Sequence, residues 1–470
     1  MNIETLAAKY SAIPSHWRLS TLGESLTAII GGGTPSRDNP SFWGGDIPWL
    51  TVKDMRGRRP TDAQEHITQQ AVKESATNII PPETVIMASR VGLGKVVRVP
   101  FSTAINQDLK ALVVGPDLDK SYLEYWLLSI ATFLESIGSG TTVKGIRLER
   151  LRQLPIPLAP LQEQREIVAE LEKQFSRLDE AVANLQRVKA NLKRYKASVL
   201  KAAVEGHLVE TEATLARREG RTYETGEQLL QRIVEDRNAT AKGKRVSVNQ
   251  ADHGGLSECP DSWVWATCDA ALNSIDAGAS FKCEERPPVE GEIGVLKVSA
   301  LTWGTYDESE SKTCKDEGRV EEKFLVRDGD FLFARANTIE VVGACVIVGK
   351  TTKQLMLSDK TLRFELCPQV LPDWLQICLR CKFGRDEIER LATGNQESMR
   401  NIGQERIRQI RMPLPPLAEQ TRIVAEVDRH LSIIREVETE VDSNLQRAQA
   451  LRQATLTQAF SSKLPVQGNQ

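Results

Sequence analysis

The chain has 470 residues, of which 40% are hydrophobic and 26% are charged, and its formal net charge at pH 7 is −2. This composition is that of a soluble globular protein long enough for two or three domains. No apolar run approaches the ~18 residues of a membrane span, and the N-terminus lacks the layout of a signal peptide, so we expect a cytoplasmic protein without a membrane partner. The total charge does not indicate a nucleic-acid partner, so any DNA-binding surface must be local.

The first part of the chain has the pattern of a mixed α/β domain. Short apolar segments rich in β-branched residues, at 84–92 and 95–99, are bounded by Gly and Pro and are typical of strands. A helical period follows in residues 121–140. We therefore predict a domain of short strands and helices that ends near residue 155.

Several cationic side chains of this domain are candidates for contacts with DNA bases and phosphates. The densest group lies in Lys53–Pro60, "KDMRGRRP", near Trp43 and Trp49, and the Gly-rich segment Gly138–Gly145, "GSGTTVKG", adds a lysine. For any one of these residues the alternative is a solvated surface charge. The candidates are Arg56, Arg58, Arg59, Arg90, Lys95 and Lys144.

A long helix is predicted from Leu161 to Val204. Pro160 suits the first helical turn, where its missing N–H costs nothing. Apolar residues then alternate at spacings of three and four, apart from one extra three at Leu185–Val188, and Gly206 stops the pattern. At 1.5 Å per residue this helix is about 66 Å long, which exceeds the size of the preceding domain and predicts a second helix as its partner.

The segment that follows, residues 207–258, is polar. It contains one predicted helix at Thr225–Arg237 and a basic cluster at Lys242–Arg245. We interpret it as a surface connector, and contact with a partner subunit is the alternative.

Residues 259–411 form a second mixed α/β unit, with strands predicted at 330–336 and 343–349. All eight cysteines lie here, and since the first unit has none, the fold needs no disulfides. The one CxxC, Cys378–Cys381, sits in a predicted amphipathic helix over 371–383 without a second pair, so no zinc site is predicted. The candidate DNA contacts are Arg335, Asn337, Lys350, Lys353 and Arg400, with Lys360 in addition.

The last part of the chain repeats the long helix. "PLAPLQEQREIVAEL" at Pro157–Leu171 returns 256 residues later as "PLPPLAEQTRIVAEV" at Pro413–Val427. Weaker similarity extends through both halves, so the chain is an internal repeat. Two similar halves pair most simply about a pseudo-twofold axis, which makes the two helices an antiparallel coiled coil. The alternative is that each helix packs only on its own domain.

Catalytic motifs are not recognisable. "GACVIVGKTT" at Gly343–Thr352 has the wrong glycine spacing for a phosphate-binding loop and reads as a strand running into a turn. "NPSF" at Asn39–Phe42 is close to the tetrapeptide of amino-methyltransferases, but it lacks the second proline and no methyl-donor loop accompanies it. The five histidines have no metal-ligand spacing. We therefore predict neither a catalytic nor a metal site.

The doubled helix start is the most specific motif of the chain. "PIPLAPLQEQREIVAEL" (Pro155–Leu171) and "MPLPPLAEQTRIVAEV" (Met412–Val427) each close a variable unit, and the helix ends "LKAAVEGHL" (Leu200–Leu208) and "LTQAFSSKL" (Leu456–Leu464) are also similar. In these motifs, and in outline over essentially its whole length, the chain resembles the specificity subunit of type I restriction–modification systems.

The resemblance implies two target-recognition domains that each read one half of a bipartite, asymmetric site in double-stranded DNA, with the coiled coil fixing the gap between the halves. It implies a chain without chemistry or cofactors of its own. Two adenine-N6 methyltransferase subunits would use S-adenosylmethionine, and two motor-nuclease subunits would use ATP and Mg. The implied segments are recognition domain 1–155, spacer helix 156–206, connector 207–258, recognition domain 259–411 and spacer helix 412–470.

Family members place methyltransferase contacts on the spacer helices and adjoining faces. The candidate partner contacts are therefore Glu163, Gln164, Glu419 and Gln420 at the two helix starts. Two other classes of function stay open at this point. One is a single-chain DNA methylase or nuclease with degenerate motifs, and the other is a scaffold whose domains bind protein.

Overall fold

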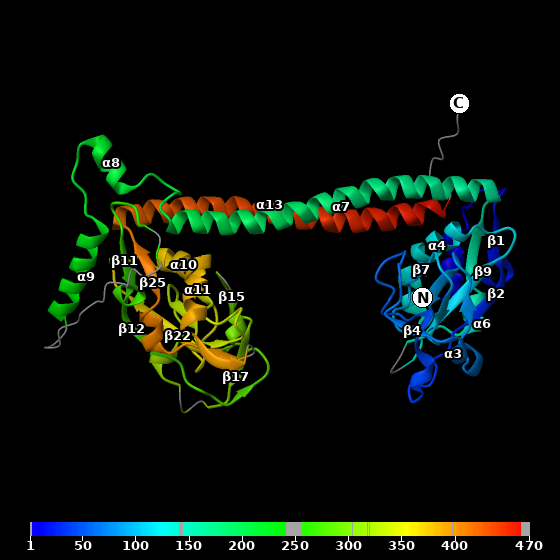
Figure 1. Cartoon of the computed structure of the whole chain (residues 1–470), viewed down its shortest axis with the longest axis horizontal. Helices are drawn as coiled ribbons and strands as arrows, with labels where there is room; N and C mark the ends of the chain where they lie inside the picture. The colour runs from blue at the N-terminus through cyan, green and yellow to red at the C-terminus, as the bar shows by residue number, and fades with distance from the viewer. Residues whose placement is uncertain are drawn as a thin grey trace. The chain divides into compact units, whose positions relative to one another are not determined.

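The computed structural model describes residues 2–140, 144–240, 256, 258–302, 304–316, 318, 320–396 and 399–461. It divides into two compact units. Unit 1 contains Met1–Arg187 and Val441–Gln470, and unit 2 contains Val188–Glu440. Each unit joins a mixed α/β domain to parts of two long helices, α7 (Leu161–Val204) and α13 (Leu417–Ala459) (Figure 1). Within the described ranges, no helix is both long and apolar enough to span a lipid bilayer.

The strands of unit 1 form two four-stranded sheets and one two-stranded ladder. Their bounds are β1 (Arg18–Thr21), β2 (Leu26–Gly31), β3 (Trp43–Leu50), β4 (Glu65–Ile67), β5 (Ile79–Ile80), β6 (Val85–Ala88), β7 (Val96–Arg98), β8 (Thr103–Ile105), β9 (Leu109–Val114) and β10 (Pro155–Leu158). The first sheet, in the order β2-β9-β6-β7, is antiparallel throughout. The second, β4-β3-β8-β5, is mixed because β3 and β8 are parallel, and β1 pairs with β10.

Most helices of unit 1 share an apolar core with the first sheet and supply its largest side chains. Besides α7 and α13 they are α1 (Ile3–Lys9), α2 (Leu22–Ser25), α3 (Gln69–Glu74), α4 (Lys120–Ser129), α5 (Ala131–Ile137) and α6 (Leu148–Arg152). The buried Tyr122 and Trp126 of α4 share one apolar cluster with Leu6 of α1. Phe460, just after α13, joins this cluster edge-to-face on Tyr122, with ring centroids 4.9 Å apart. The end of α13 is thus part of the core of unit 1.

The strands of unit 2 repeat this arrangement. Their bounds are β11 (Val264–Thr267), β12 (Leu272–Ala277), β13 (Cys283–Glu284), β14 (Gly294–Leu296), β15 (Leu301–Thr302), β16 (Thr305–Tyr306), β17 (Ser311–Cys314), β18 (Phe331–Ala334), β19 (Ala336–Asn337), β20 (Cys345–Ile347), β21 (Leu355–Met356), β22 (Thr361–Leu366), β23 (Thr393–Gln396), β24 (Met399–Asn401) and β25 (Arg411–Leu414). The sheet β12-β22-β18-β20 has the order of β2-β9-β6-β7, and the ladder of β11 with β25 matches that of β1 with β10. The parallel pair β14 and β21 matches β3 and β8. The predicted internal repeat is therefore a repeat of fold.

The helices of unit 2 are α8 (Glu212–Glu219), α9 (Gly226–Thr240), α10 (Pro372–Arg380), α11 (Lys382–Leu391) and α12 (Gln404–Arg408), together with its parts of α7 and α13. Trp374 of α10 packs edge-to-face on Trp263, with ring centroids 5.7 Å apart. Leu229, Leu230 and Ile233 of α9 belong to the same apolar core. The connector is thus partly built into this unit, although its basic cluster at Lys242–Arg245 lies outside the described residues.

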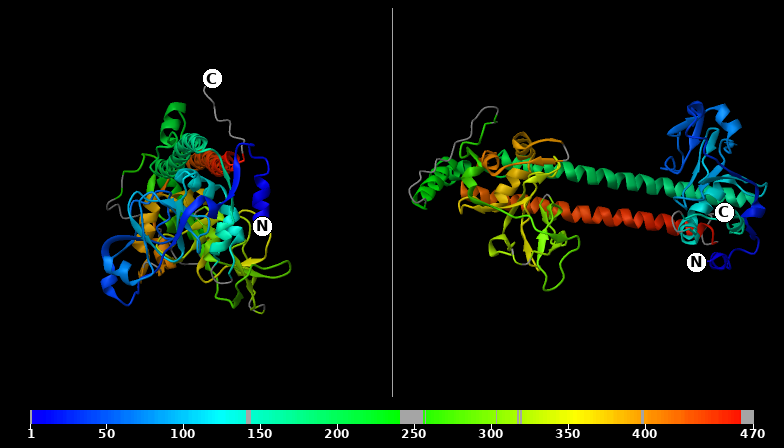
Figure 2. Two further views of the ribbon diagram at one scale, coloured as in Figure 1. Left: turned by 90° about the vertical axis from the view of Figure 1, so that its right-hand side faces the viewer. Right: turned by 90° about the horizontal axis from the view of Figure 1, so that it is seen from below.

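The two long helices run antiparallel within each unit. In unit 1 Arg452, near the end of α13, lies over the ring of Phe175 and pairs with Asp179, both near the start of α7. In unit 2 Tyr195, near the end of α7, is 2.9 Å from the ring of His430, near the start of α13. Figure 2 shows the two helices side by side. Buried positions in α13 recur every seven residues, at Val427, Ile434, Val441, Ala448 and Thr455. The predicted antiparallel coiled coil is confirmed.

Local predictions succeed where apolar periodicity is strong and fail at helix boundaries. The four predicted strands are β6, β7, β18 and β20, and the connector helix predicted at Thr225–Arg237 is α9. The helix predicted over 121–140 is two helices, because the chain turns at Ile130. The helix predicted over 371–383 breaks at Cys381, whose extended backbone caps α11 and whose Sγ accepts a bond from Gly384 N. Helix α8 was not predicted.

Candidate nucleic-acid interface

Each long helix starts with the same glutamine lock. Gln164 Oε1 accepts a hydrogen bond from Asp119 N at 2.9 Å, and Gln420 Oε1 accepts one from Leu371 N at 3.0 Å. The amide nitrogen of each glutamine donates to two backbone carbonyls, and one of these carbonyls lies just before the start of the glutamine's own helix. Both residues are 0% exposed. Because a buried amide is costly to leave unpaired, these bonds fix each helix to the domain that it follows.

A tryptophan–glutamate pair completes each lock. Trp17 Nε1 donates to Glu163 at 3.0 Å, and Trp263 Nε1 donates to Glu419 at 2.7 Å. The Glu163 side chain is 27% exposed and also lies 2.9 Å from His16 Nε2. Glu419 is 0% exposed, and burial raises its pKa above the ordinary value. The four residues predicted as partner contacts therefore have internal roles.

Of these four residues, only Glu163 presents part of its side chain to solvent. For Gln164, Glu419 and Gln420 the bonds described above account for their repetition in the sequence. Contact with a partner subunit stays a prediction for all four. Side chains that a partner subunit could reach lie further along α7 and α13 and include the exposed Val188, Ile433 and Leu451.

The DNA-contact candidates of unit 1 separate to the two ends of the β6–β7 hairpin. Beyond the Ala88 end, Ile146 N donates to Ser89 O at 2.9 Å, and Val91 N donates to Lys144 O at 3.4 Å. These bonds bring Arg90 and Lys144 together, both exposed, and the exposed Lys95 closes the same turn. We call residues 89–91 and 144–146 the platform of unit 1. Residues 141–143 of the predicted Gly-rich segment lie outside the described residues.

Unit 2 builds the same platform from residues 335–337 and 399–402. Ile402 N donates to Arg335 O at 2.9 Å, which matches the bond from Ile146 N to Ser89 O. Asn337 of β19 lies opposite Arg400 of β24 in antiparallel register. Three of the five sequence candidates of this unit, Arg335, Asn337 and Arg400, therefore meet on one surface.

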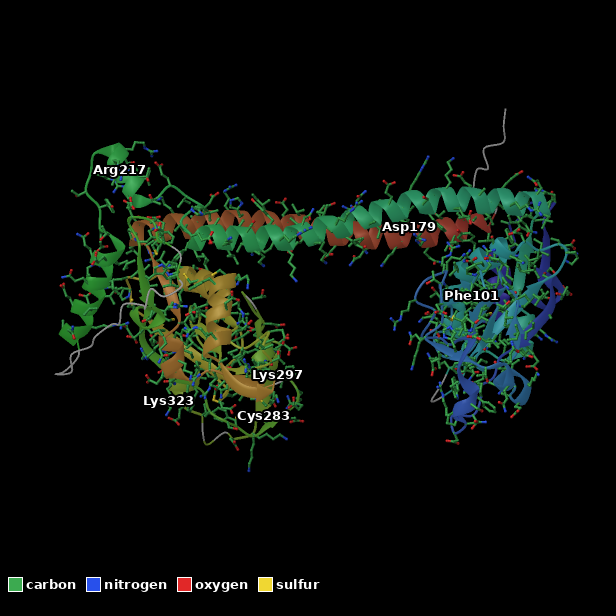
Figure 3. The ribbon with its side chains drawn as sticks, in the orientation of Figure 1. Phe101, Asp179, Arg217, Cys283, Lys297 and Lys323 are labelled. Atoms are coloured by element: carbon green, nitrogen blue, oxygen red, sulfur yellow. The ribbon has the colours of Figure 1, made fainter. Side chains whose placement is uncertain are left out.

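A groove that contains three lysines adjoins the platform of unit 2. Arg335 N donates to Lys360 O at 2.9 Å, which places the exposed Lys360 beside the platform. Lys360, Lys297 and Lys312 line a groove of about 650 Å³ together with Cys283, Glu285 and Asp359. Figure 3 labels Lys297 and Cys283. Lys312 also pairs with Glu285. Lysine side chains beside a surface of this kind suit the phosphate groups of a nucleic acid.

Two more candidates of unit 1, Arg58 and Arg59, lie at the far end of the hairpin around a buried carboxylate. The register of β6 and β7 places Arg98 opposite Val85, away from the platform. Glu124 is 0% exposed and forms ion pairs with Arg58 at 3.0 Å, Arg59 at 2.6 Å and Arg98 at 3.2 Å. Burial would raise the pKa of Glu124, but hydrogen bonds and charge from Arg59 and Arg58 outweigh it and lower the pKa. These arginines stabilise the fold, and contact with DNA stays a prediction for them.

Arg56, Lys350 and Lys353 also lie away from the platforms. Arg56 is exposed, and its Nε donates to Lys53 O at 3.3 Å. In unit 2, Ile347 at the end of β20 pairs with Phe331 at the start of β18, so Lys350 and Lys353 follow the strand end opposite to Arg335. The threonines between them bond to the carboxylates of Asp328 and Glu308. Their contact with DNA stays a prediction.

Clusters of metal-ligating side chains and reactive thiols are two further kinds of chemical group that a site could contain. Among the described residues, no group of three or more His, Cys, Asp and Glu side chains could hold a metal ion. Burial raises the pKa of the Cys378 thiol well above its ordinary value, which keeps it protonated and a poor nucleophile. Sequence reasoning missed Val91 and Met399, the exposed apolar residues of the two platforms, because nothing in a single sequence marks an apolar residue as exposed.

Known proteins resemble this chain in sequence over part or all of its length. The family described as "Type I restriction modification DNA specificity domain" matches residues 14–193. The specificity subunit of the Escherichia coli type I restriction enzyme EcoEI is 29% identical over 55% of this chain, and the match spans 44% of that protein, less than half of its length. The EcoKI specificity subunit of Escherichia coli (strain K12) is 22% identical, with 97% of this chain and 90% of that protein covered.

Solved structures show the same fold. A chain from a structural study of complex assembly and conformational transition of "the type I R-M system" superposes with a TM-score of 0.63 at 19% identity, covering 96% of this chain and 99% of the other. The HsdS subunit from Thermoanaerobacter tengcongensis superposes with a TM-score of 0.51 at 17% identity, covering 96% and 98%. These identities are too low to carry residue roles across, so they support the architecture alone.

Proposed function

Because the chain belongs to the family of type I restriction–modification specificity subunits, we propose that it is the sequence-specific DNA-binding subunit of such a complex. Each α/β domain reads one half of a bipartite, asymmetric site in double-stranded DNA. The observation that carries this proposal is the platform, which is built twice by the same backbone bonds and carries different side chains in the two units. Equivalent surfaces with different side chains suit two half-sites of different sequence.

The proposal assigns the chemistry to partner subunits. The chain has no catalytic role and no cofactor of its own, and it acts in the cytoplasm with two methyltransferase and two motor-nuclease subunits. S-adenosylmethionine, ATP and Mg belong to those subunits. The exposed sides of α7 and α13 dock the methyltransferases, and the length of the paired helices sets the number of untouched base pairs between the half-sites.

The most direct test is to map N6-methyladenine in DNA from cells that express this chain with its methyltransferase partner. We expect methylation at one bipartite motif, and none when either protein is expressed alone. Methyl transfer by the purified chain alone would show that it is an enzyme and would contradict the proposal.

Salt dependence separates DNA binding from a protein scaffold. Phosphate contacts make affinity for DNA fall steeply between about 50 and 200 mM salt, by roughly 10³- to 10⁵-fold for six to ten contacts. A binding constant that hardly changes over this range would contradict readout of DNA by the two domains.

Modularity is tested by exchange of parts. Replacing residues 1–155 with the same segment of a relative is expected to change one half-site and to leave the other half and the gap intact. Adding seven residues to α7 within Leu171–Val199, with a matching addition to α13, is expected to lengthen the gap without changing the bases read. A change in both half-sites would reject independent recognition domains.

A further inference from the structure

Val91 and Asn337 occupy the same place in the two platforms. Val91 N donates to Lys144 O, and Asn337 lies opposite Arg400 in the β19–β24 ladder. The bond from residue 146 to residue 89 has its match in the bond from residue 402 to residue 335, so the registers agree. Each platform therefore presents a pair of neighbouring side chains, valine with lysine in unit 1 and asparagine with arginine in unit 2.

Val91 is held in a conformation and an environment that do not favour valine. Its φ is 45°, in the left-handed region that β-branched residues avoid, and its side chain is 50% exposed. Burial of the side chain therefore does not compensate for the strained backbone. Gly92 follows with a φ of 74°, and a Cβ there would lie 2.9 Å from Val52, so the turn is packed in place. Strained residues held by their surroundings concentrate at functional sites.

The platform of unit 2 contains polar atoms that are not satisfied within the described part of the protein. Among the described residues, Arg400 Nε and Asn401 Oδ1 are buried atoms without a hydrogen-bond partner. A second nitrogen of Arg400 donates to Gly394 O at 2.5 Å, which orients the guanidinium. Met399, next to it, is 57% exposed. Buried polar atoms are normally paired. Asn337 Oδ1 accepts a hydrogen bond from Thr338 N at 2.7 Å, and an amide group with a second lone pair on its oxygen and two N–H donors can still bond to a ligand.

The chemistry of the two pairs matches the edges of bases in the major groove. Asparagine pairs with adenine N6 and N7, arginine and lysine bond to guanine O6 and N7, and apolar side chains contact the thymine methyl. Resting on the proposed function, we propose that these pairs read neighbouring bases. Asn337 and Arg400 read an adenine and a guanine in one half-site, and Val91 and Lys144 read a thymine and a guanine in the other.

Selection of DNA duplexes from a random library by the full-length chain, followed by sequencing, tests this assignment. Asn337→Ala is expected to relax the preference at one position of one half-site by roughly 5- to 150-fold, the range of one good bidentate base contact. Val91→Ala is expected to relax the preference at one position of the other half-site by a smaller factor, because an apolar contact is lost. The other half-site and the gap are expected to stay unchanged. Val91→Gly provides a variant that relieves the backbone strain, so its loss of discrimination would not reflect misfolding.

Two matched controls belong in the same experiment. Leu19→Ala removes an apolar side chain of similar exposure, 44%, from β1, and Asn273→Ala removes an exposed amide from β12. Both are expected to select the wild-type sequence. If wild-type protein selects a bipartite sequence and the Val91 and Asn337 variants select it unchanged, the assignment is wrong. If wild-type protein selects no sequence at all, the proposed function itself fails.

Discussion

The starts of α7 and α13 carry the same hydrogen bonds in different surroundings. Glu163 at the start of α7 is partly exposed beside His16, whereas Glu419 at the start of α13 is buried and also accepts a bond from Glu212 N at 2.8 Å. Glu212 begins α8, which belongs to the connector between the two halves. The repeat thus conserves the bonds that fix each helix, and helix α8 of the connector adds a further bond to Glu419.

The two units also differ in where they bury negative charge. In unit 1 the carboxylate of Glu124 on α4 is 0% exposed, and the aligned residue of α10 in unit 2 is the neutral Gln376. Besides Glu212 and Glu419, unit 2 buries Glu387 on α11, whose side chain pairs with Arg390 at 2.9 Å and Arg411 at 2.7 Å. The ion clusters therefore differ between the two units, whereas the bonds of the buried glutamine and of the tryptophan–glutamate pair occur in both.

If the Glu124 cluster stabilises unit 1 alone, removing its charge should affect that unit selectively. We expect Glu124→Gln to destabilise unit 1 by about 3–5 kcal/mol, because three arginines lose their buried partner. Hydrogen exchange of the full chain measures the effect unit by unit. The amides of β6, β7 and α4 should lose protection and those of β18, β20 and α10 should keep it. Glu135→Gln, at an exposed position of α5, should change stability by no more than about 0.5 kcal/mol.

Two adjacent isoleucines of α13 test whether the helix pair depends on its buried stripe. Ile434 is 2% exposed, and Ile433 is 46% exposed. We expect Ile434→Ala to lower the free energy of unfolding by about 2–5 kcal/mol through lost burial and a cavity, and Ile433→Ala to change it by about 0.5 kcal/mol or less. Urea unfolding of both variants measures the difference. Equal effects would show that the stripe is not what holds α13.

Acid should weaken unit 2 through Glu387. Burial would raise its pKa, but bonds from Arg411 and Arg390 outweigh it and lower the pKa from 4.5 to about 2. Because the folded pKa is the lower one, this stabilisation, of order 3 kcal/mol, is present above about pH 4.5 and is lost as the pH falls toward 2. The raised pKa of Glu419 acts in the opposite sense. Melting temperatures of wild-type protein and Glu387→Gln should converge on acidification, and parallel curves would contradict this.

The two long helices and their antiparallel pairing could be predicted from the sequence, because they follow from the spacing of apolar residues and from the repeated motif. The apolar stripe of α7, its proline start and its stop at Gly206 predict a helix that the structure confirms, and the repeated motif predicts the antiparallel partner. The helix breaks at Ile130 and Cys381 could not be predicted. In each case the apolar pattern continues through a turn that only tertiary packing requires.

The candidate interface was predicted only in part. Residue type picked out Arg90, Lys144, Asn337 and Arg400, which strand pairing brings onto the platforms. Residue type also pointed to Arg58, which pairs with the buried Glu124, because sequence alone does not distinguish an arginine in an internal ion pair from an exposed one. Which cations face a buried carboxylate depends on contacts between distant segments, and a single sequence does not contain them.

Removing the glutamate from each tryptophan–glutamate pair should lower stability by different amounts, because Glu419 is buried and Glu163 is partly exposed. In Glu419→Ala the buried Trp263 Nε1 and Glu212 N lose their acceptor, at about 1–3 kcal/mol for each unsatisfied group. In Glu163→Ala water can reach Trp17 Nε1, so we expect a loss of only about 0.5–1.5 kcal/mol. Urea unfolding of both variants measures the difference between the two losses of stability, which we call the gap. Glu166→Ala, at an exposed position of α7, is the control. If shortening the connector to remove α8 brought the effect of Glu419→Ala down to that of Glu163→Ala, the connector would be the cause of the asymmetry. If the gap remained, the cause would lie within the repeat itself.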